Sequence, residues 1–361
     1  MVKAAVVVLF GGRSSEHSIS SATAGGVLRA IDRERFRVVP VGITRDGAFV
    51  LEDDDPDKFA LTHGALPEVV DNGTRILWPE STLSRELQVR RGDGTVESLG
   101  DIDVVFPILH GRFGEDGTVQ GFLELLGLPY VGAGLLMSAI GMDKHTTKSI
   151  LKAAGVPVVP WIAFTRSDLD RDRELWMRRA RSLGLPVFVK PARAGSSVGV
   201  SKVSSWDEWD AALEVAFAED ATVLVEQAVV GREVECGVLE GRDGGAPRVS
   251  VAGEIVISGR DFYDFEAKYL DAPGIDLVCP ADMHDGELAE MQRIAARAFE
   301  AVGGEGLARV DFFFTGTDFY VNEVNTMPGF TPISMFPKCW IASGLPYDAL
   351  LTELIDLARV R

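Results

Sequence analysis

The stretch LARVDFFFTGTDFYVNEVN, residues 307–325, predicts two β-strands joined by a tight turn around Gly316. Side chains alternate between the two faces of a strand, so Arg309 and Asp311 point one way and Glu323 and Asn325 share a face of the second strand. If the hairpin pairs with these faces aligned, Asp311 lies beside Glu323 and Asn325, with Arg309 nearby. The predicted shared faces are Arg309, Asp311 and Phe313 on the first strand, and Val321, Glu323 and Asn325 on the second.

Two carboxylates and an amide oxygen on one face of this hairpin predict a cation site. Mg²⁺ takes one or two carboxylates and completes its octahedron with water and substrate phosphates. The alternative is a surface hairpin whose acids are solvated. The flanking residues are strongly apolar, and an acid among them is costly unless it is paired or bound to a metal.

The length and composition of the chain bound its class. Its 361 residues suggest two or three domains, and the apolar content of 46% is that of a globular protein. The formal charge of −18 argues against nucleic acid or an anionic membrane as partner. No stretch approaches the roughly 20 apolar residues of a membrane helix. The apolar run near the N-terminus has no cleavage site and is expected to be the first strand rather than a signal peptide.

The three cysteines, Cys236, Cys279 and Cys339, form no CxxC pair. This pattern argues against a disulfide framework or a zinc site and favours a reducing cytosol.

The order of predicted elements divides the chain into three parts. Residues 1–133 read as an α/β domain that begins with a βαβ unit, with a loop-rich excursion of short strands over 51–100. Residues 134–225 read as a compact α+β domain, and residues 226–361 as a third domain that carries the hairpin. We expect helices over 14–31, 118–127, 135–155, 204–218 and 286–303, with the third ending at Gly155, and a strand over 128–132.

Two glycine-containing stretches could bind anionic ligands. In PVFVKPARAGSSVGVSKV, residues 186–203, a buried strand delivers Lys190 into a Gly/Ser loop whose N–H groups could form an anion nest. A simple glycine-rich turn is equally compatible, and no Walker A loop occurs. In VLFGGRSSEHSIS, residues 8–20, Glu16 is expected in the first helical turn, where it could merely complement the helix dipole.

Three further stretches carry weaker signals when taken alone. His110 follows a strand at its carboxyl end, where α/β sheets bind ligands. Lys268 and Tyr269 lie in a long polar stretch that is typical of a mobile surface loop. Glu226 and Glu233 lie around a turn between two strands and read as structural.

The order of these stretches along the chain is more specific than any one of them. GGRSSEHSIS, HGRFGEDGTVQG, MDKHTTK, VKPARAGSSVGV, EAKY, GLARVDFFF and NEVNTMPGFTPIS together resemble the D-alanine–D-alanine ligases of the ATP-grasp superfamily. The resemblance covers the whole chain except about residues 51–100. It implies a three-domain ATP-grasp fold of class α/β and α+β, with a Rossmann-like N-terminal domain.

The same resemblance implies an ATP site between the second and third domains, with two Mg²⁺ ions for which Mn²⁺ can substitute. Metal binding would fall to Asp311, Glu323 and Asn325, with Glu323 bridging. The ATP-binding residues would be Lys144, Lys190 and Ser197 at the phosphates, Glu226 at the adenine amine and Glu233 at the ribose, with Asn322 in the same site.

For the two D-alanines, the resemblance implies that Glu16 holds the first ammonium group and that His110 lies near the first carboxylate. Arg309 and the Gly329 N–H would face the reacting carbonyl. Lys268 and Ser334 would lie near the second D-alanine and the γ-phosphate. Residues 260–275 would form a lid, and hydrogen bonds that link Glu16, Ser196 and Tyr269 would close this lid over the site.

The implied activity is ATP-dependent ligation of two D-alanines through a D-alanyl phosphate, for peptidoglycan precursors. The implied setting is a cytoplasmic homodimer that acts on D-alanine and ATP, with room for an activating monovalent cation. Three alternatives stay open at this point: a D-alanine–D-lactate or D-alanine–D-serine ligase, a non-catalytic nucleotide sensor, and an ATP-grasp ligase for unrelated acids.

Overall fold

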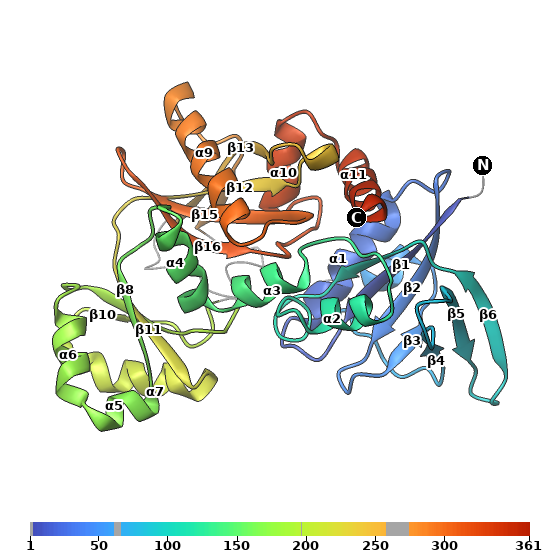
Figure 1. Ribbon diagram of the computed structural model, residues 1–361, viewed down its shortest axis with the longest axis horizontal. Helices are drawn as coiled ribbons and strands as arrows, with labels where there is room; N and C mark the ends of the chain where they lie inside the picture. The colour runs from blue at the N-terminus through green and yellow to red at the C-terminus, as the bar shows by residue number, and fades with distance from the viewer. Residues whose placement is uncertain (1–2, 61–65, 196, 258–273) are drawn as a thin grey trace.

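The computed structural model describes residues 3–60, 66–195, 197–257 and 274–361. Three lobes follow one another along the chain (Figure 1). Residues of all three lobes line one pocket. Every main element of the predicted first lobe is present except one. Residues 128–132 do not form a strand, because only Tyr130 makes a bridge, to Val105.

The first lobe is built on a four-stranded sheet in the order β3-β2-β1-β7. Strands β1 and β2, and β1 and β7, pair in parallel. Alternate residues of β1 enter different cores: Val6, Val8 and Phe10 pack toward α1 and α11, and Val7 and Leu9 pack toward α2. The elements are β1 (Ala4–Gly11), α1 (His17–Ala30), β2 (Phe36–Ile43), β3 (Phe49–Leu51), β7 (Val104–Ile108), α2 (Thr118–Leu125) and α11 (Tyr347–Val360).

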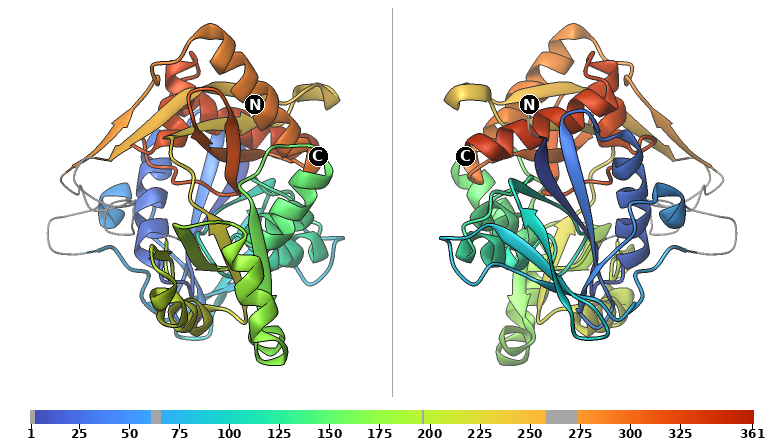
Figure 2. Two further views of the ribbon diagram at one scale, coloured as in Figure 1. Left: turned by 90° about the vertical axis from the view of Figure 1, so that its left-hand side faces the viewer. Right: turned by 90° about the vertical axis from the view of Figure 1, so that its right-hand side faces the viewer.

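The last helix of the chain belongs spatially to the first lobe. Figures 1 and 2 show α11 beside α1 and the strands of the N-terminal sheet, with Leu350, Leu351 and Leu354 buried there. The predicted excursion over 51–100 forms short elements and a small sheet of its own. They are η1 (Pro56–Phe59), β4 (Arg75–Leu77), β5 (Glu86–Arg90) and β6 (Val96–Asp101).

The helix predicted over 135–155 is two helices, α3 (Leu135–Met142) and α4 (Lys144–Ala153). Asp143 leaves the helical conformation with ψ of 103° and accepts a hydrogen bond from the Thr146 N–H, so it ends one helix and caps the next. The uninterrupted apolar pattern concealed this break. Its consequence is that Lys144 begins a new helix at the pocket.

The second lobe is an antiparallel sheet in the order β10-β9-β11-β8 with helices on one face. Two of those helices, α5 and α6, were not predicted, because the run RSDLDRDRELWMRRAR has no clear apolar stripe; side-chain caps by Thr165 and Asp172 begin them. The elements are β8 (Trp161–Thr165), α5 (Arg166–Arg171), α6 (Arg173–Arg181), β9 (Val187–Pro191), β10 (Ser201–Val203), η2 (Trp206–Glu208), α7 (Trp209–Glu219) and β11 (Thr222–Gln227).

The third lobe is a five-stranded sheet in the order β14-β13-β12-β15-β16. One face packs on α9 through Val310, Phe312 and other apolar side chains, and polar side chains of β12, β15 and β16 line the pocket. The elements are β12 (Arg232–Leu239), η3 (Arg242–Gly244), β13 (Arg248–Ile257), β14 (Ile275–Val278), α9 (Asp285–Ala301), β15 (Leu307–Phe314), β16 (Phe319–Asn325) and α10 (Met335–Ala342).

All three cysteines are free thiols, and the Sγ atoms of Cys279 and Cys339 lie 3.7 Å apart although 60 residues separate them. No helix in the described ranges is long and apolar enough to cross a membrane. The predicted domain borders at residues 133 and 225 stay predictions.

Candidate active site

A pocket of about 540 Å³ lies where the three lobes meet. It gathers residues that were predicted from widely separated stretches of sequence. Ser196, Lys268, Tyr269 and most of the predicted lid at 260–275 lie outside the described residues. All other predicted site residues line this pocket: Glu16, His110, Lys144, Lys190, Ser197, Glu226, Glu233, Arg309, Asp311, Asn322, Glu323, Asn325, Gly329 and Ser334.

The hairpin has the register that the sequence predicts. Asp311 pairs with Glu323, and Arg309 pairs with Asn325. The register shifts immediately after Asp311, so that Phe312 pairs with Val321 and Asn322 has no partner of its own. This irregularity is a β-bulge, which re-aims the side chains around it.

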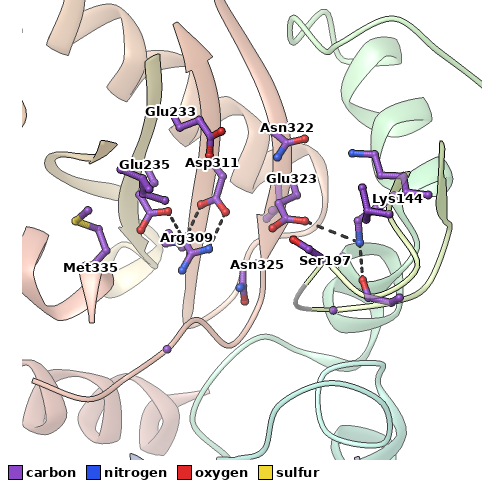
Figure 3. Close-up of a pocket in the computed structure, with 18 of the residues that line it drawn as sticks. Lys144, Ser197, Glu233, Glu235, Arg309, Asp311, Asn322, Glu323, Asn325 and Met335 are labelled. Carbon is purple, nitrogen blue, oxygen red and sulfur yellow. Dashed lines mark hydrogen bonds and ion pairs between the residues drawn. The ribbon is translucent and has the colours of Figure 1, made fainter. Parts of the chain in front are cut away.

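The bulge corrects one predicted face. Val321 does not share the face of Glu323; it is fully buried in the core, and Asn322 and Glu323 both line the pocket instead. Strict alternation would have sent Asn322 away from Glu323. Figure 3 shows Asn322, Glu323 and Asn325 along one edge of the pocket.

Arg309 holds the acidic side of the pocket together. Its Nε and Nη2 atoms donate to the two carboxylate oxygens of Asp311 at 2.6 and 2.7 Å, and its Nε lies 3.2 Å from Glu235 Oε2 (Figure 3). Burial by itself lowers the pKa of Arg309, but the charges of Asp311 and Glu235 outweigh burial and raise that pKa well above its ordinary value. We call Arg309, Asp311 and Glu235 the acidic triad, since it has two acids for one base.

Lysines occupy the opposite side of the pocket. The Lys144 Nζ atom donates to the Ala194 carbonyl at 2.7 Å and lies 3.9 Å from Glu323 Oε2, so it bridges the second and third lobes (Figure 3). Ala194 begins the Gly/Ser loop, in which Ser197 has a φ of 59° and Gly199 a φ of 75°. We call this loop, together with Lys144 and Lys190, the positively charged rim of the pocket, since the two lysines supply its charge.

A second group of three charges lies on the β9 and β11 side of the pocket. Glu226 makes an ion pair with Lys190 through Oε2, and its Oε1 lies 3.2 Å from the Nζ of Lys148. Burial alone would raise the pKa of Glu226, but the two lysines lower it below its usual value. We call Lys148, Lys190 and Glu226 the basic triad, since it has two bases for one acid.

The first lobe closes the pocket with Glu16. This residue is the N-cap of α1 rather than a member of its first turn, which corrects the predicted helix start, and its side chain makes no cap hydrogen bond. A Cβ atom on Gly111 would lie 2.7 Å from Glu16 Oε2, and one on Gly195 would lie 3.2 Å from it. Glycine at both positions lets the backbones of two lobes approach one carboxylate.

His110 lies beside Glu16 and is buried. Its Nδ1 atom lies 3.1 Å from the Met327 carbonyl, and its Nε2 atom makes no hydrogen bond with any described residue. Burial lowers the pKa of His110, although the charge of Glu16 opposes that effect. The ring is therefore held by one nitrogen and offers the other to a ligand.

Glu115 was not predicted, although it lies in the quoted stretch HGRFGEDG. Its carboxyl group accepts hydrogen bonds from the Gly111 N–H at 2.5 Å and the Met327 N–H at 3.2 Å. Burial and the nearby charge of Glu16 raise the pKa of Glu115 to about 8. Its signal was an acid in a glycine-rich loop directly after a buried strand.

Two other residues of the site were missed. Glu235 follows Glu233 by two residues on β12 and faces Asp311 across the sheet, so period-two acids on an otherwise apolar strand were its signal. Lys148 follows Lys144 by one helical turn in MDKHTTK, which placed it near the same site.

The turn after β16 places Gly329 and Ser334 together. A Cβ atom on Gly329 would lie 3.2 Å from Ser334 Oγ, and that hydroxyl lies 2.8 Å from Thr331 Oγ1. Ser334 also precedes α10 as its N-cap residue. Because Gly329 has no side chain, its backbone is accessible from the pocket.

The hairpin fits a magnesium site in its chemistry. Asp311, Glu323 and Asn325 offer only carboxylate and amide oxygens, which Mg²⁺ prefers. Asp311 has acceptor capacity beyond its two bonds to Arg309, since a carboxylate has about four lone-pair sites. Within the described residues no three His, Cys, Asp or Glu side chains are placed to hold a metal.

Comparison with known proteins accounts for nearly the whole chain. Residues 5–133 match the family described as D-ala D-ala ligase N-terminus, and residues 150–356 match D-ala D-ala ligase C-terminus. The chain belongs to the D-alanine–D-alanine ligase family.

Full-length relatives agree with this assignment. The D-alanine–D-alanine ligase of Kineococcus radiotolerans is 52% identical, over 99% of this chain and 97% of that protein. The enzyme of the same name from Paenarthrobacter aurescens is 50% identical, over 99% of this chain and 95% of that protein.

Solved structures of this family confirm the expected ATP-grasp fold. The D-alanine–D-alanine ligase of Coxiella burnetii superposes with a TM-score of 0.82 at 36% identity, covering 99% of this chain and 94% of that one. The VanG D-Ala:D-Ser ligase of Enterococcus faecalis superposes with a TM-score of 0.85 at 34% identity, covering 99% and 100%.

Proposed function

We propose that the chain is an ATP-dependent ligase that joins two D-alanines into D-alanyl-D-alanine for peptidoglycan precursor synthesis. The observation that carries the proposal is the division of one pocket into two charged sides. The acidic triad and Glu323 face a lysine-lined rim, and Glu16 and His110 close the pocket from the first lobe. The family membership supports the same activity.

ATP binds between the second and third lobes. Lys144, Lys190 and the loop at Ser197 contact the phosphates, because they form the positively charged rim. The adenine base lies toward Glu226 of the basic triad, and the ribose lies toward Glu233. Asn322 belongs to the same site.

Asp311, Glu323 and Asn325 would hold two Mg²⁺ ions, for which Mn²⁺ could substitute, and Glu323 would be the ligand that the two ions share. When bound, such ions neutralise the phosphate charges and orient the γ-phosphate for transfer. The residues of the chain supply the oxygen ligands and the adjacent lysines.

The first D-alanine binds at the mouth of the first lobe. Glu16 accepts hydrogen bonds from its ammonium group, and the open Nε2 of His110 faces its carboxylate. Burial lowers the pKa of His110. The charges of Glu16 and of a bound substrate carboxylate act against burial and favour the protonated ring, in which Nε2 can donate. Binding holds the carboxylate oxygen so that it attacks the γ-phosphorus, ADP leaves, and D-alanyl phosphate forms.

The second D-alanine then attacks the activated carbonyl carbon through its neutral amine. Arg309 and the backbone N–H of Gly329 stabilise the oxyanion that develops on that carbonyl. Inorganic phosphate leaves as the carbon–oxygen bond breaks, and the nitrogen loses a proton to give the peptide bond. Ser334 lies near the acceptor. In this proposal Ser196, Lys268 and Tyr269, which are outside the described residues, complete the closed site.

The experiment is coupled ADP release with D-alanine and with L-alanine, with the product identified by mass spectrometry. We expect release with D-alanine only, and a dipeptide product. ADP release that is independent of D-alanine would contradict the proposal. So would full activity of Glu16→Gln, which would favour an ATP-grasp ligase for unrelated acids.

A D-alanine–D-serine ligase is the second candidate, because a D-Ala:D-Ser ligase is among the structural neighbours. Relatives at about 50% identity carry the D-alanine–D-alanine name and favour D-alanine as acceptor. Competition of D-alanine with D-serine and D-lactate at neutral pH decides between them. A mixed dipeptide or depsipeptide as the main product would overturn our assignment.

The proposed cellular setting is a homodimer in the cytoplasm, in three domains with borders at residues 133 and 225. A monovalent cation as activator belongs to the same proposal. Light scattering of the purified chain tests the homodimer. Activity assays in K⁺ against Na⁺ test the monovalent cation.

A further inference from the structure

Lys148 is more deeply buried than the two lysines of the positively charged rim, with 1% of its side chain exposed against 17% for Lys144 and 12% for Lys190. It lies on α4 one turn after Lys144, but Lys144 lines the pocket and Lys148 lies behind the pocket wall. A buried ammonium group is costly unless it is paired. Its ion pair is with Glu226, at 3.2 Å from Oε1.

Lys148 Nζ and Glu226 Oε1 are both buried, and they form an ion pair with each other at 3.2 Å. A carboxylate has about four lone-pair sites, so Glu226 keeps acceptor capacity beside the two lysines. Glu226 lines the pocket, whereas Lys148 lies behind it. A donor arriving in the pocket can reach the carboxylate while the lysine stays behind it.

The other lysine of the basic triad has a second task under the proposed function. Lys190 pairs with Glu226 through Oε2, yet it also belongs to the rim proposed to bind phosphate. If ATP draws Lys190 toward its phosphates, Lys148 is the cation that stays with Glu226. The other charges of this region are Lys144 on the same helix and Glu323, which lies 3.9 Å from Lys144.

We propose that Lys148 is a positioning residue that keeps Glu226 an ionised, fixed acceptor for the 6-amino group of adenine and thereby sets selectivity for adenine over 6-oxopurines. A carboxylate can only accept hydrogen bonds, so it favours an amino group and rejects a carbonyl oxygen. Without the buried cation, burial favours the protonated acid, which can donate to a 6-oxopurine. This inference rests on the proposed function, because it takes ATP as the ligand.

The experiment compares kcat/KM for ATP, purine riboside triphosphate and inosine triphosphate. The purine analogue differs from ATP only by the missing 6-amino group, whereas inosine triphosphate has a 6-oxo group and a hydrogen on N1. A hydrogen bond to a charged acceptor predicts that the native enzyme prefers ATP to the purine analogue by about 10- to 100-fold. In Lys148→Met and Lys148→Gln we expect this ratio to fall to about 3-fold or less. The preference over inosine triphosphate falls with it, whereas KM for D-alanine is unchanged.

Two variants control for a merely structural role. Lys148→Arg keeps the cation and retains most of the ratio. Lys152→Met removes an exposed lysine from the same helix, where it lies over Trp161, and leaves the ratio at its native value. If Lys148 only stabilised the fold, its loss would lower kcat/KM for all three nucleotides equally. The ratio of kcat/KM for ATP to that for the purine analogue would then stay at its native value.

The outcomes separate this inference from the proposed function. If either folded neutral variant of Lys148 keeps the native ratio, Lys148 does not position Glu226 and the inference is wrong. If Glu226→Gln also keeps the native ratio, the adenine contact itself is wrong. If Glu226→Gln loses the ratio and the Lys148 variants keep it, only the inference about Lys148 fails.

Discussion

The acidic and basic triads are mirror arrangements of charge in one pocket. Arg309 lies between Asp311 and Glu235, and Glu226 lies between Lys148 and Lys190. Each triad buries three charges, and the three formal charges sum to one net charge of opposite sign on the two sides.

The opposite net charges of the two triads indicate which kind of ligand each side of the pocket binds. A buried charge is stable only when it is paired, and the net charge on each side favours a ligand of opposite sign. The acidic side suits a divalent cation, and the basic side with its rim suits phosphate. Together they fit a magnesium–nucleotide complex better than either ligand alone.

The largest expected effect comes from weakening the acidic side at Glu323. Glu323→Gln keeps the shape but removes a charge at the proposed metal site, so we expect kcat to fall by at least about 10³-fold, as for loss of a principal charge-stabilising group. D-Alanine-dependent ADP release measures it. Unchanged release would show that Glu323 is not a metal ligand. Glu97→Gln, on the exposed strand β6, is the matched control and should be silent.

Replacing the central guanidinium group of the acidic triad has the next largest expected effect. Arg309→Lys keeps a charge but loses the two-pronged contact with Asp311, so we expect a fall in kcat of about 10²- to 10³-fold with a smaller change in KM for ATP. Steady-state kinetics with both substrates checks the split. A change confined to KM would place Arg309 in binding rather than in stabilising the oxyanion.

The hairpin was accessible to sequence reasoning because its information is local. Alternation along β15 and β16 and a short turn fix which residues face each other, and the predicted pairing of Asp311 with Glu323 is confirmed. The bulge at Asn322 was not accessible, because its cause is the register of the whole sheet. It moved Val321 into the core and Asn322 into the site.

The basic triad shows the opposite case. Lys148 and Glu226 are 78 positions apart, and nothing local marks the lysine as buried or the pair as adjacent. The stretch around Glu226 read as purely structural until the resemblance gave it a role. Likewise, the break at Asp143 depends on a single capping side chain within an apolar pattern.

Weakening the basic side should affect nucleotide binding more than chemistry. In Lys190→Met we expect KM for ATP to rise by about 10-fold or more, because a charged phosphate contact is lost. KM for D-alanine should change little, since Glu16 and His110 lie on the first lobe. Titration with ATP in the absence of D-alanine measures the binding loss directly, and an unchanged affinity would contradict the assignment.

Glu115 tests what happens to a buried carboxyl group that belongs to neither triad. Among the described residues no Lys or Arg pairs with it; it is held by two backbone N–H groups, and burial with the charge of Glu16 raises its pKa to about 8. The ordinary value is 4.5, so between about pH 4.5 and pH 8 the folded state holds a proton that the unfolded state has released. Stability contributed by this proton is present at low pH and is lost as the pH rises toward 8.

Glu115→Gln removes that titration and stays neutral at every pH. We therefore expect the melting temperature of the variant, relative to the native protein, to rise steadily from pH 5 to pH 8 and then level off. Each kcal/mol of difference should appear as about 2–4 °C. Melting curves without metal or nucleotide check this, with the exposed Glu97→Gln as a control that shows no such trend. A flat difference would mean that Glu115 is already ionised at pH 5, in which case its two N–H donors outweigh burial and it acts as a further anion of the pocket.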